Sequence, residues 1–216
     1  MAADSEIFAA LKKGDLARVK AMLGENGTLA TARDAEGVSL LMQAQYRDQK
    51  GIVERLVSLH PALDLFEACA LGKTDRIAKL LDENARAVDS YSPDGYTPLH
   101  LAAFFGQPAA VSLLLDRGAK VDAVSKNSMK LMPLHSAATG GSTESVELLL
   151  ARGADPNARQ NAGFLPLQSA AANGNVAMVK ALLAKGADPQ AASDDGRTAK
   201  DLAEAQEHDE VVALLG

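Results

Sequence analysis

The stretch DGYTPLHLAAFFG, residues 94–106, followed by AAVSLLLDRGAKVDA at 109–123, decides the fold of this chain. A glycine turn leads to a proline, which suits the first turn of a helix because that position needs no N–H donor. Small residues follow until a glycine ends the helix. A second helix then carries apolar residues at V-x-x-L spacing, on one face, and ends at Gly118. Two adjacent phenylalanines close the first helix, and their role depends on whether this pattern repeats.

The pattern does repeat along the chain. Taking Gly106 as the reference, the residues five and eight positions later are Val111 and Leu114, and the same apolar spacing recurs elsewhere. The other reference residues are Gly14, Asp48, Gly72, Gly141, Gly174 and Glu207. From Gly72 onward they are separated by 34, 35, 33 and 33 residues, so the chain is built from repeated helix pairs.

The TPLH and GAD segments at this period resemble ankyrin repeats, and the resemblance covers nearly the whole chain. It implies an all-α ankyrin repeat solenoid of about seven helix-turn-helix units. Short β-hairpin fingers, the turns that project between one helix pair and the next, would join the units. The single domain divides into an N-terminal capping repeat (1–32), internal repeats (33–60, 61–92, 93–126, 127–160 and 161–193) and a C-terminal capping repeat (194–216). The polar terminal units lead us to expect a complete array.

Two segments depart from the family pattern. Only 24 residues separate Asp48 from Gly72, about ten fewer than elsewhere, which predicts a missing finger near residues 60–63. A tolerated deletion explains this better than a functional notch in the binding face, although both remain open. The second departure is 124–135, which we count as one residue longer than its neighbours, with Lys130 where the turn glycine is expected. A locally different turn is therefore predicted there.

Composition limits the function classes. The 216 residues are 47% hydrophobic and only 4% aromatic, which favours closely packed helices. The net charge of −6 argues against nucleic acid or a membrane as the partner. The single cysteine excludes an internal disulfide, and no signal peptide or long apolar run is found, so we expect a cytoplasmic protein.

No catalytic pattern is found in the sequence. TGGST at 139–143 has glycines but lacks the lysine of a phosphate-binding loop. The resemblance implies that His100 and His135 support hydrogen bonds between neighbouring turns, and Cys69 falls at a packed small-residue position. We therefore expect no enzyme and no catalytic, cofactor-binding or metal-binding residue.

The resemblance also implies which side chains face the concave groove: the two before each reference residue and the one after each turn glycine. Six of the eight aromatic residues map to the groove or the fingers, and exposed aromatic groups often mark an interface. The expected partner-binding residues are Tyr96, Phe104, Phe105, Tyr46, Arg47, Tyr91, Leu131 and Phe164.

These observations predict a scaffold that acts as a monomeric protein-binding module, holding a protein or peptide on its concave face. Two other uses remain open: a small-molecule or enzymatic site in the same groove, and structural self-association through the apolar patch. A third alternative concerns the site alone. Tyr91, Tyr96 and Phe104 could pack on one another as a local core that seals the missing finger.

Overall fold

The computed structural model describes residues 2–216, with side chains from residue 4 onward. Fourteen α-helices follow one another in pairs within this part of the chain. They are α1 (Ala2–Lys12), α2 (Leu16–Glu25), α3 (Leu40–Tyr46), α4 (Lys50–Leu59), α5 (Leu65–Ala70), α6 (Thr74–Glu83), α7 (Pro98–Phe104), α8 (Pro108–Asp116), α9 (Pro133–Thr139), α10 (Thr143–Ala151), α11 (Pro166–Ala172), α12 (Val176–Ala184), α13 (Ala199–Ala205) and α14 (Asp209–Leu215). Three short 3-10 helices lie at Gly27–Thr31, Ala85–Asp89 and Asn161–Gly163.

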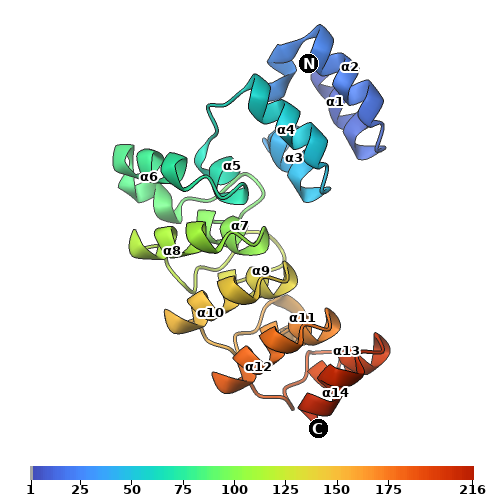
Figure 1. Ribbon diagram of the computed structural model, residues 1–216, viewed down its shortest axis with the longest axis vertical. Coiled ribbons are helices and arrows are strands. Elements are labelled where there is room, and N and C mark those ends of the chain that lie inside the picture. The colour runs from blue at the N-terminus through green and yellow to red at the C-terminus, as the bar shows by residue number, and fades with distance from the viewer. Residues whose placement is uncertain (1) are drawn as a thin grey trace.

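The helices form two rows in a curved array (Figure 1). From α5 to α13 the odd-numbered helices stack on one another along the inner side of the curve. The even-numbered helices from α6 to α14 form the outer row. Leucines and alanines such as Leu99, Ala102 and Leu114 are fully buried between the rows. The predicted all-α repeat solenoid is confirmed. No helix among residues 2–216 is long and apolar enough to cross a membrane.

The repeat register read from the sequence matches the backbone. All seven reference residues have positive φ, between 51° and 77°, including the two that are not glycine, Asp48 and Glu207. A side chain is disfavoured in this left-handed region, so both positions carry backbone strain that the other five avoid. The reference position is therefore defined by its left-handed backbone conformation in the turn between the two helices of each pair.

A buried histidine ties each of two inner helices to the following finger. His100 is 1% exposed, and its Nδ1 accepts from the backbone N–H of Thr97, which caps α7. Its Nε2 therefore carries the proton and donates to the carbonyl of Leu131 at 2.9 Å. His135 donates in the same way to the carbonyl of Ala158, also at 2.9 Å. Burial lowers the pKa of His100 to about 4 and lowers that of His135 as well, so both are neutral structural groups.

The expected β-hairpin fingers are not formed as strands. Within residues 2–216 the structure has only one isolated bridge, between Arg33 and Ser39. A typical finger closes after four residues, as where Ser92 N donates to Tyr96 O at 2.8 Å, which leaves no length for a ladder. Successive fingers are instead joined by single backbone bonds, such as Lys126 N to Gly95 O at 2.8 Å.

The finger at 123–132 is two residues longer than the others, and our count of one was wrong. Its closing bond runs from Ser125 N to Leu131 O, across six residues, whereas Ser193 N to Arg197 O spans four. Lys130 nevertheless adopts φ of 52°, the conformation expected of the turn glycine. The extra residues enlarge the tip of this finger and leave its base unchanged.

Residues 60–64 alone connect α4 to α5. An open hollow of about 410 Å³ lies beside this short connection, lined by residues that include Val57, Leu63 and Arg76. The finger before α3 lies against the finger before α7: a Cβ added to Gly37 would be 3.4 Å from the Pro93 side chain. Two fingers that are separated in sequence by two helix pairs, α3–α4 and α5–α6, are thus neighbours in space.

Candidate partner-binding site

The short junction brings the end of α3 close to the end of α7. Tyr46 is the last residue of α3, and its ring centroid lies 5.4 Å from that of Phe105. At the corresponding position of the intervening helix α5 stands Ala70, which is small and fully buried. Phe104 packs edge-on against Phe105, with centroids 5.1 Å apart. Three aromatic rings from two helices therefore form a continuous group.

A hydrogen bond fixes Tyr46 in place. Its hydroxyl donates to Oδ2 of Asp94 at 2.6 Å, across 48 residues of sequence. Burial and the neighbouring carboxylate both raise the pKa of Tyr46 far above its ordinary value. Tyr46 and Phe105 both pack against the main core and are only partly exposed. They therefore project into the groove less freely than the alignment predicted.

The rings of Tyr46 and Phe104 form one wall of a small cavity of about 70 Å³. The surface of the cavity is almost wholly carbon. Both ring nitrogens of His100 are already bonded elsewhere, so this residue presents carbon to the cavity. The lining residues are Tyr46, Tyr96, His100, Leu101, Phe104, Leu131, Ser136 and Thr139.

Tyr96 and Leu131 complete the site from two adjacent fingers. The Tyr96 ring is half-buried, 5.9 Å from that of His100, and burial raises its pKa. The backbone of Leu131 is held by His100, whose Nε2 donates a hydrogen bond to the Leu131 carbonyl. The structure therefore brings together five of the eight expected residues, which we call the aromatic cluster: Tyr46, Tyr96, Phe104, Phe105 and Leu131.

Arg47 and Tyr91 lie outside this cluster. The Arg47 guanidinium donates back to the carbonyl of Gln43 on its own helix at 2.9 Å, and it lines a separate hollow beside Phe8. The Tyr91 hydroxyl donates to the carbonyl of Val124 at 3.1 Å. Both side chains are thus engaged in local contacts.

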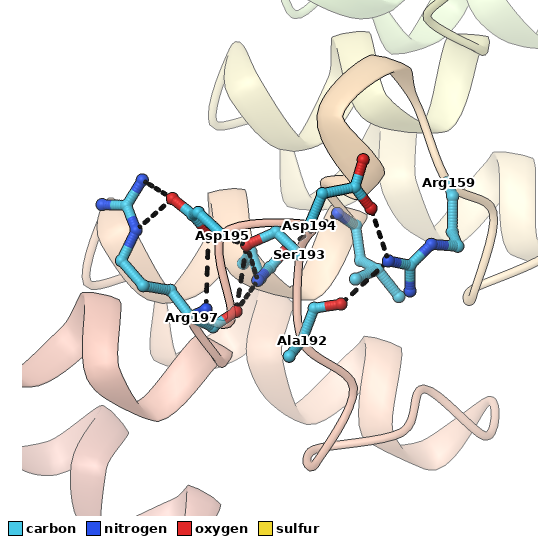
Figure 2. Close-up of polar contacts among 8 residues, drawn as sticks. Arg159, Ala192, Ser193, Asp194, Asp195 and Arg197 are labelled. Carbon is cyan, nitrogen blue, oxygen red and sulfur yellow. Dashed lines mark hydrogen bonds and ion pairs between the residues drawn. The ribbon is translucent and has the colours of Figure 1, made fainter.

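Phe164 lies beside the polar finger that precedes α13. In this finger Asp195 accepts hydrogen bonds from Arg197 and Ser193, which lower its pKa to about 2 (Figure 2). Arg159 of the preceding finger donates to the Ala192 carbonyl at 2.9 Å (Figure 2). The Arg197 guanidinium lies 6.0 Å from the Phe164 ring, so Phe164 is part of a charged surface away from the cavity.

The short junction at residues 60–64 is not sealed by packing among Tyr91, Tyr96 and Phe104, which was the local-core alternative. Ring contacts in the described part of the chain join Tyr46 to Phe105, Phe104 to Phe105 and Tyr96 to His100, with no pair among Tyr91, Tyr96 and Phe104. Asp94, which holds Tyr46, was missed because nothing in its local sequence distinguishes it from an ordinary turn aspartate.

Cys69 is fully buried, and burial raises the pKa of its thiol, which disfavours the reactive thiolate. Among side chains 4–216, no three His, Cys, Asp or Glu residues come close enough together to hold a metal ion.

The aligned turns, the paired helices and the buried histidines define a class of helical repeat protein. The family model described as ankyrin repeats (3 copies) matches residues 65–160 and 134–216, and the chain belongs to the ankyrin repeat family. It is also similar to "Ankyrin repeat and SAM domain-containing protein 6" of Danio rerio, at 29% identity over 92 residues. That alignment covers 39% of this chain and 12% of the relative. Ankyrin repeats are generally protein–protein interaction modules and are generally non-enzymatic.

Proposed function

We propose that this chain is a non-enzymatic, monomeric binding module that holds a protein or peptide partner at the aromatic cluster. The observation that carries the proposal is the carbon-lined cavity between Tyr46, Tyr96, Phe104 and Leu131. A small apolar cavity walled by aromatic rings is the form that an anchoring pocket takes at a protein interface. Arg47, Tyr91 and Phe164 lie outside the cavity, and in this proposal they contact the partner away from its anchoring group.

The walls of the cavity support this proposal because they are already ordered without a partner. Tyr46 is held by Asp94, and Leu131 is held through His100. A surface that is fixed in advance loses little conformational entropy when a partner binds. Phe104 differs from the other rings, because it is half-buried and packs on Phe105 without joining the main core. It is the ring best placed to contact a partner.

The cavity offers little to an enzymatic use. The only histidine that lines it has both nitrogens bonded, and the remaining polar lining residues are Ser136, Thr139 and the two tyrosines. Ser136 is itself 2% exposed. These groups do not include a free acid, base or activated nucleophile of the kind that catalysis requires.

The test is photo-crosslinking from position 104. We expect Phe104→benzoylphenylalanine in the full chain to form one discrete crosslinked product in a lysate of its source cells, which mass spectrometry would identify. The same probe at Lys180, an exposed residue of α12, serves as the matched control and should not form that product. Crosslinks of equal yield at both positions would contradict the proposal.

Stability measurements must accompany this test. We expect Phe104→Ser to unfold at nearly the same denaturant concentration as the unmodified chain, because its ring contacts only Phe105 among the aromatic residues. Leu114→Ala, at a fully buried position of α8, should instead cost about 2–5 kcal/mol. A comparably large loss for Phe104→Ser would mean that this ring is core.

A further inference from the structure

The finger at 123–132 is chemically unlike the fingers beside it. Its Val124 and Met129 side chains are 41% and 48% exposed. Among the described side chains only three large hydrophobic residues are so exposed, and the third, Leu214, belongs to the last helix. The next finger has Arg159 at the position of Val124, so exposed apolar surface is a property of this finger alone.

The same finger carries two exposed cations and no acid. Lys126 and Lys130 lie within the segment AVSKNSMKLM, and neither forms an ion pair with any described residue. The Lys126 ammonium instead lies 4.2 Å from the centroid of the Tyr91 ring. The finger before it contains Asp94, and in the finger after it the cation Arg159 is paired with Asp194 at 3.3 Å. This finger is thus a cationic, apolar surface on a chain whose net charge is −6.

This surface is continuous with the cavity. Leu131 closes the finger and lines the cavity, and Asn127 donates to the carbonyl of Asp94 at 3.1 Å in the adjacent finger. On the far side Met129 accepts a backbone hydrogen bond from Asn161 at 3.0 Å. The enlarged tip is therefore held on both sides, next to Tyr96 and Phe104.

We propose that the cavity and the 123–132 finger bind an acidic peptide segment of a partner protein, with one aliphatic side chain in the cavity and carboxylates against Lys126 and Lys130. This rests on the protein-binding function proposed above and specifies the chemistry of the partner. A cavity of about 70 Å³ is about half the roughly 150 Å³ of an engineered apolar cavity that binds benzene, so it suits a short branched aliphatic group better than an aromatic ring. Unpaired cations beside an apolar anchor favour carboxylates on the partner.

The experiment is an unbiased peptide selection on the full chain. A displayed library of random peptides about twelve residues long should yield binders with a Leu, Ile, Val or Met flanked by Asp and Glu. Replacing that aliphatic residue by alanine in a selected peptide should weaken binding at least about tenfold. Enrichment of basic sequences, or of no common sequence, would overturn the proposal.

Two protein variants test the location. Lys126→Glu combined with Lys130→Glu should weaken the selected acidic peptides about tenfold or more and remove most of the salt dependence of binding. Lys180→Glu combined with Lys185→Glu, an equal change of net charge at exposed positions in and at the end of α12, is the matched control and should leave binding unchanged. Equal weakening by the control would show that net charge alone drives the association, which contradicts a site at the finger.

Phe104→Ser separates this inference from the function on which it rests. It should abolish binding of the acidic peptides while circular dichroism shows the helices intact. Selected peptides that depend on Phe104 but carry no acidic residues would overturn the charge assignment and leave the protein-binding function standing. Peptides that depend on neither Phe104 nor the two lysines would contradict both proposals.

Discussion

The junction between α4 and α5 and the junction between α8 and α9 connect the same kinds of helix pair by different means. At the second, a finger donates a backbone N–H to the finger before it, and buried His100 donates to the carbonyl of Leu131. At the first, only residues 60–64 are present, and side chains supply the link. Tyr46 reaches Asp94 and Phe105, and Arg33 donates to Asp64 at 2.9 Å.

This difference shows how the array tolerates the loss of a finger. Backbone bonds recur at each regular junction whatever the side chains are, so they are insensitive to most substitutions. The short junction instead depends on a few particular side chains, and Tyr46 has a part in two of its contacts. We therefore expect single substitutions to weaken coupling more at the short junction than at the others.

The largest effect on stability should come from protonating His100, which links α7 to the next finger at a regular junction. The folded-state pKa of His100 is about 4, below the ordinary value of 6.5, so its contribution is present above pH 6.5 and is lost as the pH falls towards 4. That shift corresponds to about 3 kcal/mol. His100→Gln should keep the hydrogen bond, as Gln168 does at the same position of α11 by donating to the carbonyl of Arg197, and should flatten this acid dependence.

Urea unfolding at about pH 7 and about pH 4.5 measures this effect. The converse change, Gln168→His, is the matched control and should add an acid-dependent loss of stability to a junction that now lacks one. An unchanged pH dependence in His100→Gln would mean that carboxylates elsewhere control acid unfolding.

A smaller effect is expected from Tyr46→Phe at the short junction. The change removes the hydrogen bond to Asp94 and retains the ring on Phe105, so we expect a loss of about 1–2 kcal/mol. Hydrogen exchange should speed up in α1–α4 before it does in α7–α14. The control is Tyr91→Phe, whose bond to the Val124 carbonyl is exposed, with an expected loss below about 0.5 kcal/mol. Uniformly faster exchange along the whole array would contradict a locally weak junction.

The smallest effect concerns backbone strain at the end of α3. Asp48 has φ of 51°, and its side chain is exposed, so Asp48→Gly should stabilise the chain by about 0.5 kcal/mol in thermal unfolding. The reverse change in the regular part, Gly106→Asp, introduces the same strain at φ of 63° and should cost about 1 kcal/mol. Equal and opposite shifts would show that the two turns differ only in this residue, whereas destabilisation by Asp48→Gly would reveal a role for its carboxylate.

Much of the fold could be predicted because its information is local and repeated. The apolar spacing that followed Asp48 and Glu207 marked them as reference positions although neither is glycine, and both adopt the positive φ of that position. The shortened spacing after Asp48 likewise predicted a missing finger near residues 60–63, and residues 60–64 form the shortest link between successive helix pairs. Finger details were less accessible: the strands did not form, and the length of the 123–132 finger was underestimated, since a residue count does not show which pair closes the turn.

The candidate site was predicted less well than the fold. Alignment placed Tyr46 and Phe105 in groove positions of different repeats, but it could not show that their rings meet across Ala70. Arg47 was expected in the same groove, and its guanidinium instead bonds to its own helix. Contacts of this kind depend on how far apart non-adjacent helices lie, which the periodicity does not contain.

The sequence by itself thus determined the helix pairs, their register and the family, because each unit encodes its own turns and buried face within about 33 residues. Only the tertiary structure decided which of these aromatic rings pack against the main core and which does not. The short junction brings α3 within reach of α7, so Tyr46 and Phe105 became part of the framework and Phe104 remained at the edge of the cavity. The physical reason is that a missing finger changes distances between helices while leaving the pattern within each helix intact.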